Sequence, residues 1–276
     1  MLRVAALQYC ASDDVAKTLH HIQPLIAEAA SKARLVALPE CANYLAASRE
    51  QLFQRAEWDD ESYSQKWLGN IAREFGIWLL AGSLIMRRRD NNQLVNRSLL
   101  FGPDGAVVAD YDKIHMFDAD VGDGKSYQES ASFLAGHSPV IAHIDNVPCG
   151  LTICYDVRFA HLYRQLALDG AQLFLVPAAF TALSGKAHWH VLLRARAIET
   201  GCYIVAPAQS GTHADGRKTY GHSLIINPWG EVMAEAKDGD AIIYATLDLS
   251  ATARAQNAIP SLYTNPVIGP TRMIGP

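Results

Sequence analysis

The fold is decided by the stretch Gly150-Leu151-Thr152-Ile153-Cys154-Tyr155-Asp156-Val157-Arg158-Phe159. Its apolar first half predicts a strand that delivers Cys154 to a sharp turn, and the amphipathic sequence from Phe159 predicts a helix over 159–169. A thiol placed there resembles a nucleophile elbow, in which backbone N–H groups at the start of the helix face developing negative charge. A small buried side chain at a strand end is the alternative interpretation, and this stretch alone favours it.

The composition of the whole chain is typical of a globular protein. Of the 276 residues 50% are hydrophobic and 19% are charged, so the chain can bury a large core. The formal net charge of −4 offers no basic field for phosphate backbones, so we expect no nucleic-acid partner. Apolar runs such as 242–249 are too short to span a bilayer, so we expect no membrane partner.

The N-terminus and the cysteines indicate the cellular compartment. Residues 1–10 go straight into strand-like sequence and lack a long apolar segment with a cleavage site, which favours a cytoplasmic protein. The five cysteines are an odd number at irregular intervals, so a disulfide framework is not expected. At least one of them is therefore a candidate for a reactive thiol.

The supply of strands predicts two sheets. About a dozen strand-like segments alternate with helical patterns over 15–32, 50–75, 159–169 and 186–200, and no linker divides residues 1–276, which we expect to form a single domain. One doubly wound sheet does not normally hold so many strands, whereas two packed sheets covered by helices would. Residues 251–276 carry four prolines and few regular features, and we expect this tail to contact a partner subunit.

Three reactive side chains follow predicted strands: Glu40, Lys113 and Cys154. If the carboxyl ends of these strands lie together, the three side chains suffice for acyl transfer from an amide. Glu40 takes the thiol proton, Cys154 attacks the carbonyl carbon, and Lys113 with a backbone N–H near Tyr155 holds the oxyanion. Taken singly, a helix-cap acid, a solvated lysine and a core cysteine are the favoured alternatives, and only joint placement reverses this.

Four segments, in chain order, resemble the signatures of the carbon–nitrogen hydrolase (nitrilase) superfamily: Leu38-Pro39-Glu40, Tyr111-Asp112-Lys113-Ile114-His115, Gly150 to Asp156, and Asn227-Pro228-Trp229-Gly230. The resemblance implies an α/β fold, an α-β-β-α sandwich of two mostly six-stranded sheets flanked by helices, that pairs into homodimers or higher homo-oligomers. It implies a Glu-Lys-Cys triad at Glu40, Lys113 and Cys154, with Glu129 as a second glutamate that supports the lysine. We therefore expect a cofactor-free hydrolase of linear amides.

Within the superfamily, residues 187–200, 206–213 and 220–223 look most like the deaminated glutathione amidases. That branch implies hydrolysis of deaminated glutathione, a small carboxylate-bearing amide, to 2-oxoglutarate and cysteinylglycine. One alternative is an ω-amidase acting on 2-oxoglutaramate or 2-oxosuccinamate, and another is a catalytically silent binding protein of the same fold. Leu183-Ser184-Gly185 departs from the Thr-Gly that both subgroups usually show in this loop.

Three further residues are candidates for substrate binding. Arg158, four residues after Cys154, is placed to fork onto a substrate carboxylate, although pairing with a neighbouring acid such as Asp156 is an equal alternative. Phe180 and Thr181 follow a predicted strand end and are expected to line the pocket.

Two patterns imitate metal sites. Residues 118–129 have acids at positions one, three and twelve of a calcium loop, but Gly122 and Asp123 stand where the motif needs an oxygen ligand and then a glycine. We interpret this segment as a loop that places Glu129. His188 and His190 suggest zinc, but no second ligand pair recurs at a finger-like spacing, so we expect no metal.

Overall fold

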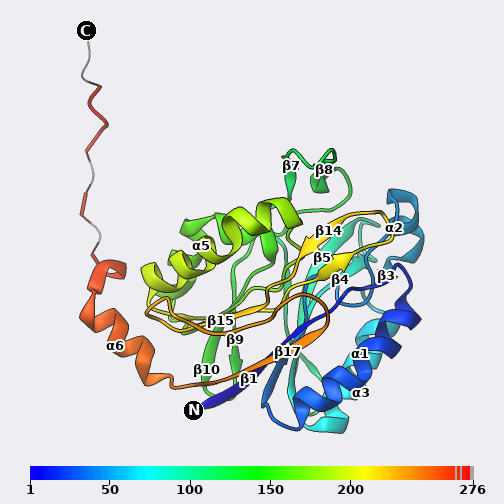
Figure 1. The fold of residues 1–276 in the computed structure, drawn as a ribbon, viewed down its shortest axis with the longest axis horizontal. Helices are drawn as coiled ribbons and strands as arrows, with labels where there is room; N and C mark the ends of the chain where they lie inside the picture. Colours follow the sequence, from blue (N-terminus) through cyan, green and yellow to red (C-terminus); the bar gives the residue numbers. More distant parts are fainter. Residues whose placement is uncertain (265, 268, 274–276) are drawn as a thin grey trace.

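Two β-sheets pack against each other in the computed structural model, which describes residues 1–264, 266–267 and 269–273 (Figure 1). The first sheet has the order β17 (Ala241–Leu247), β1 (Leu2–Gln8), β2 (Leu35–Ala37), β4 (Trp78–Arg87), β5 (Leu94–Phe101) and β6 (Val107–Asp112), with β3 (Glu57–Trp58) paired to β4. The second sheet has the order β16 (Val232–Glu235), β15 (Leu224–Ile226), β12 (Tyr203–Ala206), β11 (Leu173–Leu175), β10 (Val147–Leu151) and β9 (Val140–Ile144).

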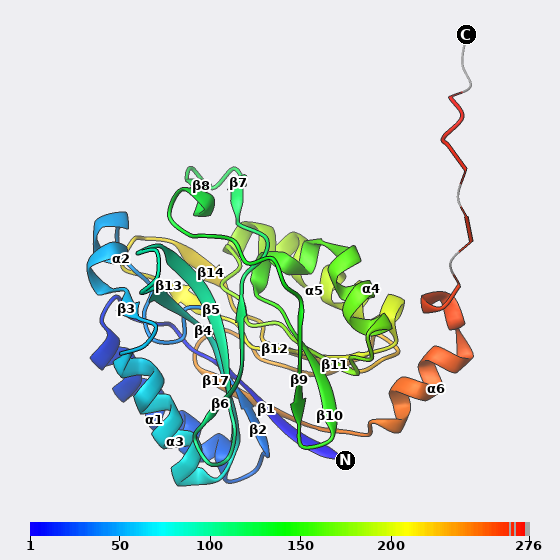
Figure 2. The ribbon, with the colours of Figure 1, turned by 180° about the vertical axis from the view of Figure 1, so that it is seen from behind.

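Helices cover the outer faces of this sheet pair. In both views α1 (Val15–Ala30) and α3 (Tyr63–Phe75) lie on one side, and α4 (Ala160–Leu168) and α5 (Ala182–Thr200) lie on the other (Figures 1 and 2). The predicted α-β-β-α sandwich is thus confirmed. The remaining helices are α2 (Arg49–Arg55), α6 (Ser250–Ala258) and the short 3-10 turns η1 (Glu129–Ala131), η2 (Cys154–Arg158) and η3 (Pro260–Leu262).

Two hairpins stand outside the sheets. They pair β7 (Asp118–Asp120) with β8 (Ser126–Gln128), and β13 (Ser210–Thr212) with β14 (Lys218–Tyr220). Lys125 at the first hairpin donates a hydrogen bond from Nζ to the carbonyl oxygen of Asp215 at the second, over 2.7 Å. The two loops therefore contact each other, although they lie far apart in the sequence.

Local sequence explains where the elements begin and which faces they bury. Asp14 accepts a hydrogen bond from the Lys17 backbone N–H over 2.9 Å and so caps α1. Ile22 and Ile26, one turn apart, are fully buried on the face of α1 that packs on the first sheet. Each such burial stabilises the fold by about 1.5–3 kcal/mol.

The core between the sheets takes apolar side chains from both. Val4 and Leu80 of the first sheet belong to the same buried cluster as Leu151 and Phe174 of the second. Strands β1, β2 and β4 are parallel to one another, as are β10, β11 and β12. The segments that leave the carboxyl ends of β2 and β11 meet, because the Ala179 N–H donates to the Glu40 side chain.

Three predictions about secondary structure are wrong. The pattern over 50–75 is not one helix: α2 ends at Arg55, β3 pairs with the end of β4, and Ser62 caps a new helix, α3. The helix predicted over 186–200 begins earlier, because Thr181 caps it through the Ser184 N–H. The expectation of few regular features after residue 250 is also wrong, since α6 and η3 occupy much of this segment.

Leu262 of η3 is buried in the core cluster, which ties this part of the tail to the body of the protein. Residues 265, 268 and 274–276 of the predicted tail lie outside the described residues. Over the ranges that the structure describes, no helix combines the length and apolar character needed to cross a membrane.

Candidate active site

The three reactive side chains predicted at strand ends lie together. Glu40 comes three residues after β2, Lys113 directly after β6, and Cys154 three residues after β10. The Lys113 Nζ donates to Glu40 Oε1 over 2.9 Å, and Cys154 lines the same cavity as these two side chains. Lys113 and Glu40 are only 2% and 5% exposed, so this ion pair is buried.

Glu129 completes a group of two carboxylates around one ammonium. Its Oε1 and Oε2 accept hydrogen bonds from Lys113 Nζ over 2.9 and 2.8 Å, and Oε2 also accepts from the Phe117 N–H. Residues 118–129 thus form the β7–β8 hairpin and a turn that presents Glu129 to the lysine, as the sequence predicts for this segment.

Asn96, in the middle of β5, is a member of this group that sequence reasoning missed. Its Nδ2 donates to Glu40 Oε1 over 3.0 Å and to Glu129 Oε1 over 3.3 Å. The available signal was an amide side chain interrupting the otherwise apolar beginning of a buried strand. Asn96 therefore links the two carboxylates and limits the movement of both.

Cys154 sits in a strained turn at the start of η2. Its φ of +49° lies in the left-handed region that favours glycine, while its N–H donates to the Pro177 carbonyl oxygen over 2.8 Å. That bond joins the turn to the segment after β11. The turn therefore holds the sulfur at the meeting point of two strand ends.

A second buried carboxylate, Asp156, fixes this turn from behind. Its Oδ2 accepts from Tyr111 Oη over 2.7 Å and from the Ile153 N–H over 2.9 Å. Its Oδ1 accepts from the His115 N–H over 3.0 Å and lies 2.7 Å from His115 Nδ1. Sequence reasoning missed this role, since the partners of Asp156 come mainly from the segment that carries Lys113.

Burial and neighbouring charges set the protonation of the group. Burial raises the pKa of Cys154 well above its ordinary value, and the charge of Glu40 raises it further, so the sulfur carries its proton at neutral pH. Burial also tends to raise the pKa of Glu40, but the charge of Lys113 and hydrogen bonds from Lys113 and Asn96 lower it below the ordinary value. Despite burial, the charges of Glu129 and Glu40 raise the pKa of Lys113. The resting state is thus an ionised glutamate beside a neutral thiol.

The group opens into a cavity of about 290 Å³ that Arg158, Phe180 and Thr181 help to line. The Arg158 guanidinium lies over the Phe180 ring, 5.2 Å from its centroid, and Nη1 is 3.3 Å from His188 Nδ1. Among the described residues, Arg158 has no carboxylate partner within 4.0 Å, so the alternative in which it pairs with Asp156 is wrong. The Thr181 hydroxyl is already bonded to Ser184, at the cap of α5.

Arg49 and Arg217 also line this cavity, and sequence reasoning missed both. Arg49 begins α2, and Arg217 lies in the loop before β14, where it pairs with Asp215 over 3.2 Å. No local pattern marks them, because only the folding of distant loops brings them to one cavity. Three arginines, Arg49, Arg158 and Arg217, therefore contribute to the wall of this cavity.

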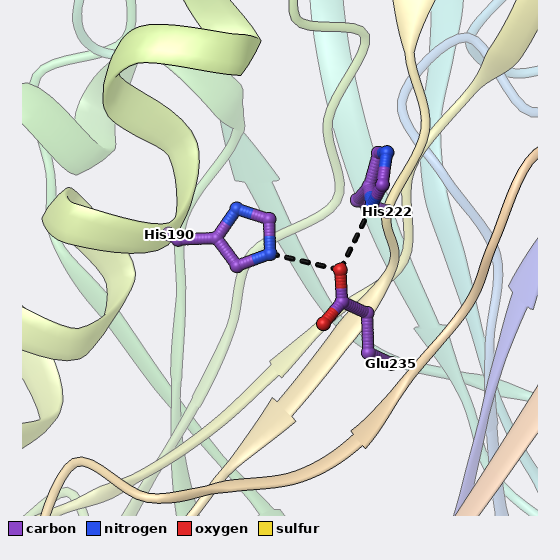
Figure 3. A group of neighbouring side chains, drawn as sticks. All are labelled: His190, His222 and Glu235. Carbon is purple, nitrogen blue, oxygen red and sulfur yellow. Dashed lines mark hydrogen bonds and ion pairs between the residues drawn. The ribbon is translucent and has the colours of Figure 1, made fainter.

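One group of possible metal ligands lies outside this cavity. Within the described residues, His190, His222 and Glu235 bring one ligand atom each to within 4.8 Å of one another (Figure 3). None of the three lines the cavity at Cys154. The other histidine of the pair considered from the sequence, His188, contacts Arg158 instead.

Comparison with known proteins gives consistent matches along the chain. A sequence model of the family described as Carbon-nitrogen hydrolase matches residues 3–257. A deaminated glutathione amidase of Synechocystis sp. is 40% identical over 262 residues, which cover 94% of this chain and 96% of that protein. Omega-amidase NIT2 of Homo sapiens is 36% identical over 261 residues, covering 94% and 92%. The crystal structure of the C. elegans NitFhit protein superposes with a TM-score of 0.89 at 34% identity, covering 96% of this chain and 65% of that one.

Proposed function

Because the chain belongs to the carbon–nitrogen hydrolase family, whose members include amidases 36–40% identical to it, we propose that it cleaves a small carboxylate-bearing amide through a thioester at Cys154. It is a hydrolase of carbon–nitrogen bonds other than peptide bonds. The proposed substrate is deaminated glutathione, and the products are 2-oxoglutarate and cysteinylglycine. The observation that carries this proposal is the buried group of Glu40, Lys113 and Glu129 on the same cavity as Cys154.

Acylation uses Glu40 as the base. Glu40 accepts the thiol proton while sulfur bonds to the amide carbon, and the carbonyl electron pair moves to oxygen. Lys113 Nζ and the Tyr155 backbone N–H hold this oxyanion. When the carbon–nitrogen bond breaks, Glu40 returns the proton to the departing amine and leaves a thioester.

Deacylation repeats these roles with water. Glu40 takes a proton from a water molecule, whose oxygen attacks the thioester carbon, and the sulfur leaves with the proton that Glu40 returns. Throughout, Glu129 and Asn96 hold Lys113 and Glu40 in place through the hydrogen bonds described above. The cycle consumes one water and needs no further reactant.

Arg158 is proposed to bind the carboxylate beside the α-keto group, because its guanidinium lies in the cavity wall without an acidic partner among the described residues. Phe180 and Thr181 shape the same wall. Arg49 favours deaminated glutathione over 2-oxoglutaramate, since it offers a cation to a carboxylate at the far end of a longer substrate, whereas Arg217 is already paired with Asp215.

We also infer a homodimer or larger homo-oligomer. Leu183, Val191 and Ile198 recur along α5 at a spacing that puts them on one face, and all three are more than half exposed. Trp229, at the turn packed beside Ile198 and Arg194, is 55% exposed and extends this apolar surface. The segment from α6 onward is a further candidate for contact with the partner. A cytoplasmic location agrees with five free cysteines.

The test compares kcat/KM for deaminated glutathione and 2-oxoglutaramate in the parent and in Cys154→Ala. We expect the longer substrate to be preferred and the variant to lose at least about 10³-fold in activity. Cys10→Ala, which changes a cysteine away from the cavity, is the matched control and should retain activity. A clear preference for 2-oxoglutaramate would replace the proposal with an ω-amidase, and inactivity of the parent on both amides would favour a silent binding protein.

A further inference from the structure

We propose that His190, His222 and Glu235 form a binding site for a divalent cation of the zinc type, separate from the cavity at Cys154 (Figure 3). The three side chains come from α5, from the loop between β14 and β15, and from the end of β16. Two imidazoles and one carboxylate are a ligand set that zinc accepts in proteins, with the remaining position left for water.

The distances are close to those of a bound ion. His190 Nε2 lies 2.9 Å from Glu235 Oε1, and His222 Nδ1 lies 2.8 Å from the same oxygen. In a tetrahedral zinc site with bonds of about 2.0–2.1 Å, neighbouring ligand atoms are about 3.3 Å apart. The three ligand atoms lie within 4.8 Å of one another, so a small outward shift of the partly exposed Glu235 side chain and small adjustments of the two imidazoles make room for the ion.

The loop that carries His222 is fixed by its surroundings. His222 has a φ of +52°, and its carbonyl oxygen accepts a hydrogen bond from Trp189 Nε1 over 2.7 Å. Trp189 is fully buried and directly precedes His190, so one contact sets the spacing of both histidines. The Tyr220 ring stacks on His222 with centroids 4.3 Å apart, which restricts rotation of the imidazole. Such support from outside the ligands is typical of metal sites.

The charge of the group also suits a cation. Glu235 supplies a carboxylate, and a ring nitrogen of each histidine lies within 2.9 Å of the same carboxylate oxygen. The pair of His21 and Asp240, 2.7 Å apart, is an ordinary histidine–carboxylate contact by comparison, because no second imidazole of the described residues forms a group with it.

A bound ion would connect α5 to the second sheet. Thr181 caps the beginning of this helix and lines the cavity at Cys154, whereas His190 lies in its middle. The expected consequence of binding is therefore added thermal stability of the sheet–helix contact, and the hydrolytic chemistry does not depend on it.

The test is a zinc titration of the full chain carrying Cys154→Ala, which removes the thiol in the cavity as a competing ligand. We expect one saturable site and a rise in Tm of about 5 °C at a hundredfold excess over Kd. Loss of an outer partner already weakens metal sites 10–100-fold, so Glu235→Gln and His190→Gln should each weaken binding about 100-fold or more. Glu231→Gln alters a nearby exposed carboxylate and should bind zinc like the parent.

Cobalt absorption identifies the ligands. Nitrogen and oxygen ligation without a thiolate charge-transfer band supports the site, whereas a thiolate band assigns the metal to cysteine and overturns it. The proposal also fails if the two ligand variants bind zinc as the parent does, or if zinc leaves the Tm of the parent unchanged, in which case the three side chains form a hydrogen-bonded network only.

Discussion

Two buried carboxylates flank Cys154, and their surroundings differ. Glu40 faces the cavity and shares the Lys113 ammonium with Glu129, so its charge is balanced by a cation. Asp156 lies behind the turn, is completely buried, and is held by Tyr111, by the Ile153 N–H and by the backbone and imidazole of His115. A carboxylate that must exchange a proton is placed beside another charge and the reacting atom, whereas one that positions a turn is surrounded by donors. The surroundings therefore distinguish Glu40, which acts in catalysis, from Asp156, which positions the turn.

Lys113→Gln should produce the largest effect, because it leaves Glu40 and Glu129 buried without a cation. We expect a loss of about 3–5 kcal/mol in the free energy of unfolding at neutral pH and a fall of at least about 10³-fold in kcat/KM. Chemical denaturation and steady-state kinetics measure the two effects. Lys66→Gln, which changes an exposed lysine of α3, is the control and should change stability by less than about 1 kcal/mol. A fall below tenfold in Lys113→Gln would remove the lysine from the mechanism.

Asp156→Asn should have a smaller effect on rate than on stability. The amide replaces one acceptor oxygen with a donor, so at least one of the groups around it loses its partner, at about 2–3 kcal/mol in unfolding free energy. We expect kcat to fall about 10–100-fold with KM nearly unchanged, because the turn shifts while the reacting groups remain. Tyr111→Phe removes a single donor and should give a milder form of both changes. Equal losses in Asp156→Asn and Lys113→Gln would erase the distinction between the two carboxylates.

The smallest expected effect is a shift of the acid side of the pH profile. Because the pKa of Glu40 is lowered, its contribution to stability is fully present above the ordinary value of 4.5 and is lost as the pH falls through the lower folded value. Activity should decline over the same range, since the base must be ionised. Asn96→Ala removes one hydrogen bond that lowers this pKa, so the acid limb of kcat/KM should move upward, by less than about one pH unit. A downward shift would contradict the assignment.

The strand ends that carry the site could be predicted from local sequence. Short apolar runs predict β2 and β11, and the residues that follow them are then placed by the parallel pairing of strands. The helix predicted over 15–32 is observed over 15–30, because its apolar spacing identifies the face that is buried. The contacts that sequence could not predict join residues far apart in the chain. Tyr111 and Asp156 are 45 residues apart, and nothing in the sequence around either residue indicates that they are hydrogen-bonded.

The break between α2 and α3 was missed for a related reason. Glu57 ends the first helical pattern by pairing with the far end of β4 and by accepting hydrogen bonds from Ser62 and Ser64. Charged and aromatic residues on both sides of Glu57 continue the helical spacing, so periodicity alone predicts one uninterrupted helix. The cavity arginines likewise come from loops whose positions follow from the packing of other elements.

The backbone angle at Cys154 has a consequence for protein engineering. A left-handed φ costs a residue with a side chain about 1 kcal/mol, and glycine adopts it without that cost. A screen that selects only for thermal stability would therefore enrich Cys154→Gly, a substitution that relieves the backbone strain and removes the nucleophile. Sequence libraries for this scaffold should hold residue 154 constant, since the residue that best fits the backbone conformation there, glycine, lacks the catalytic thiol.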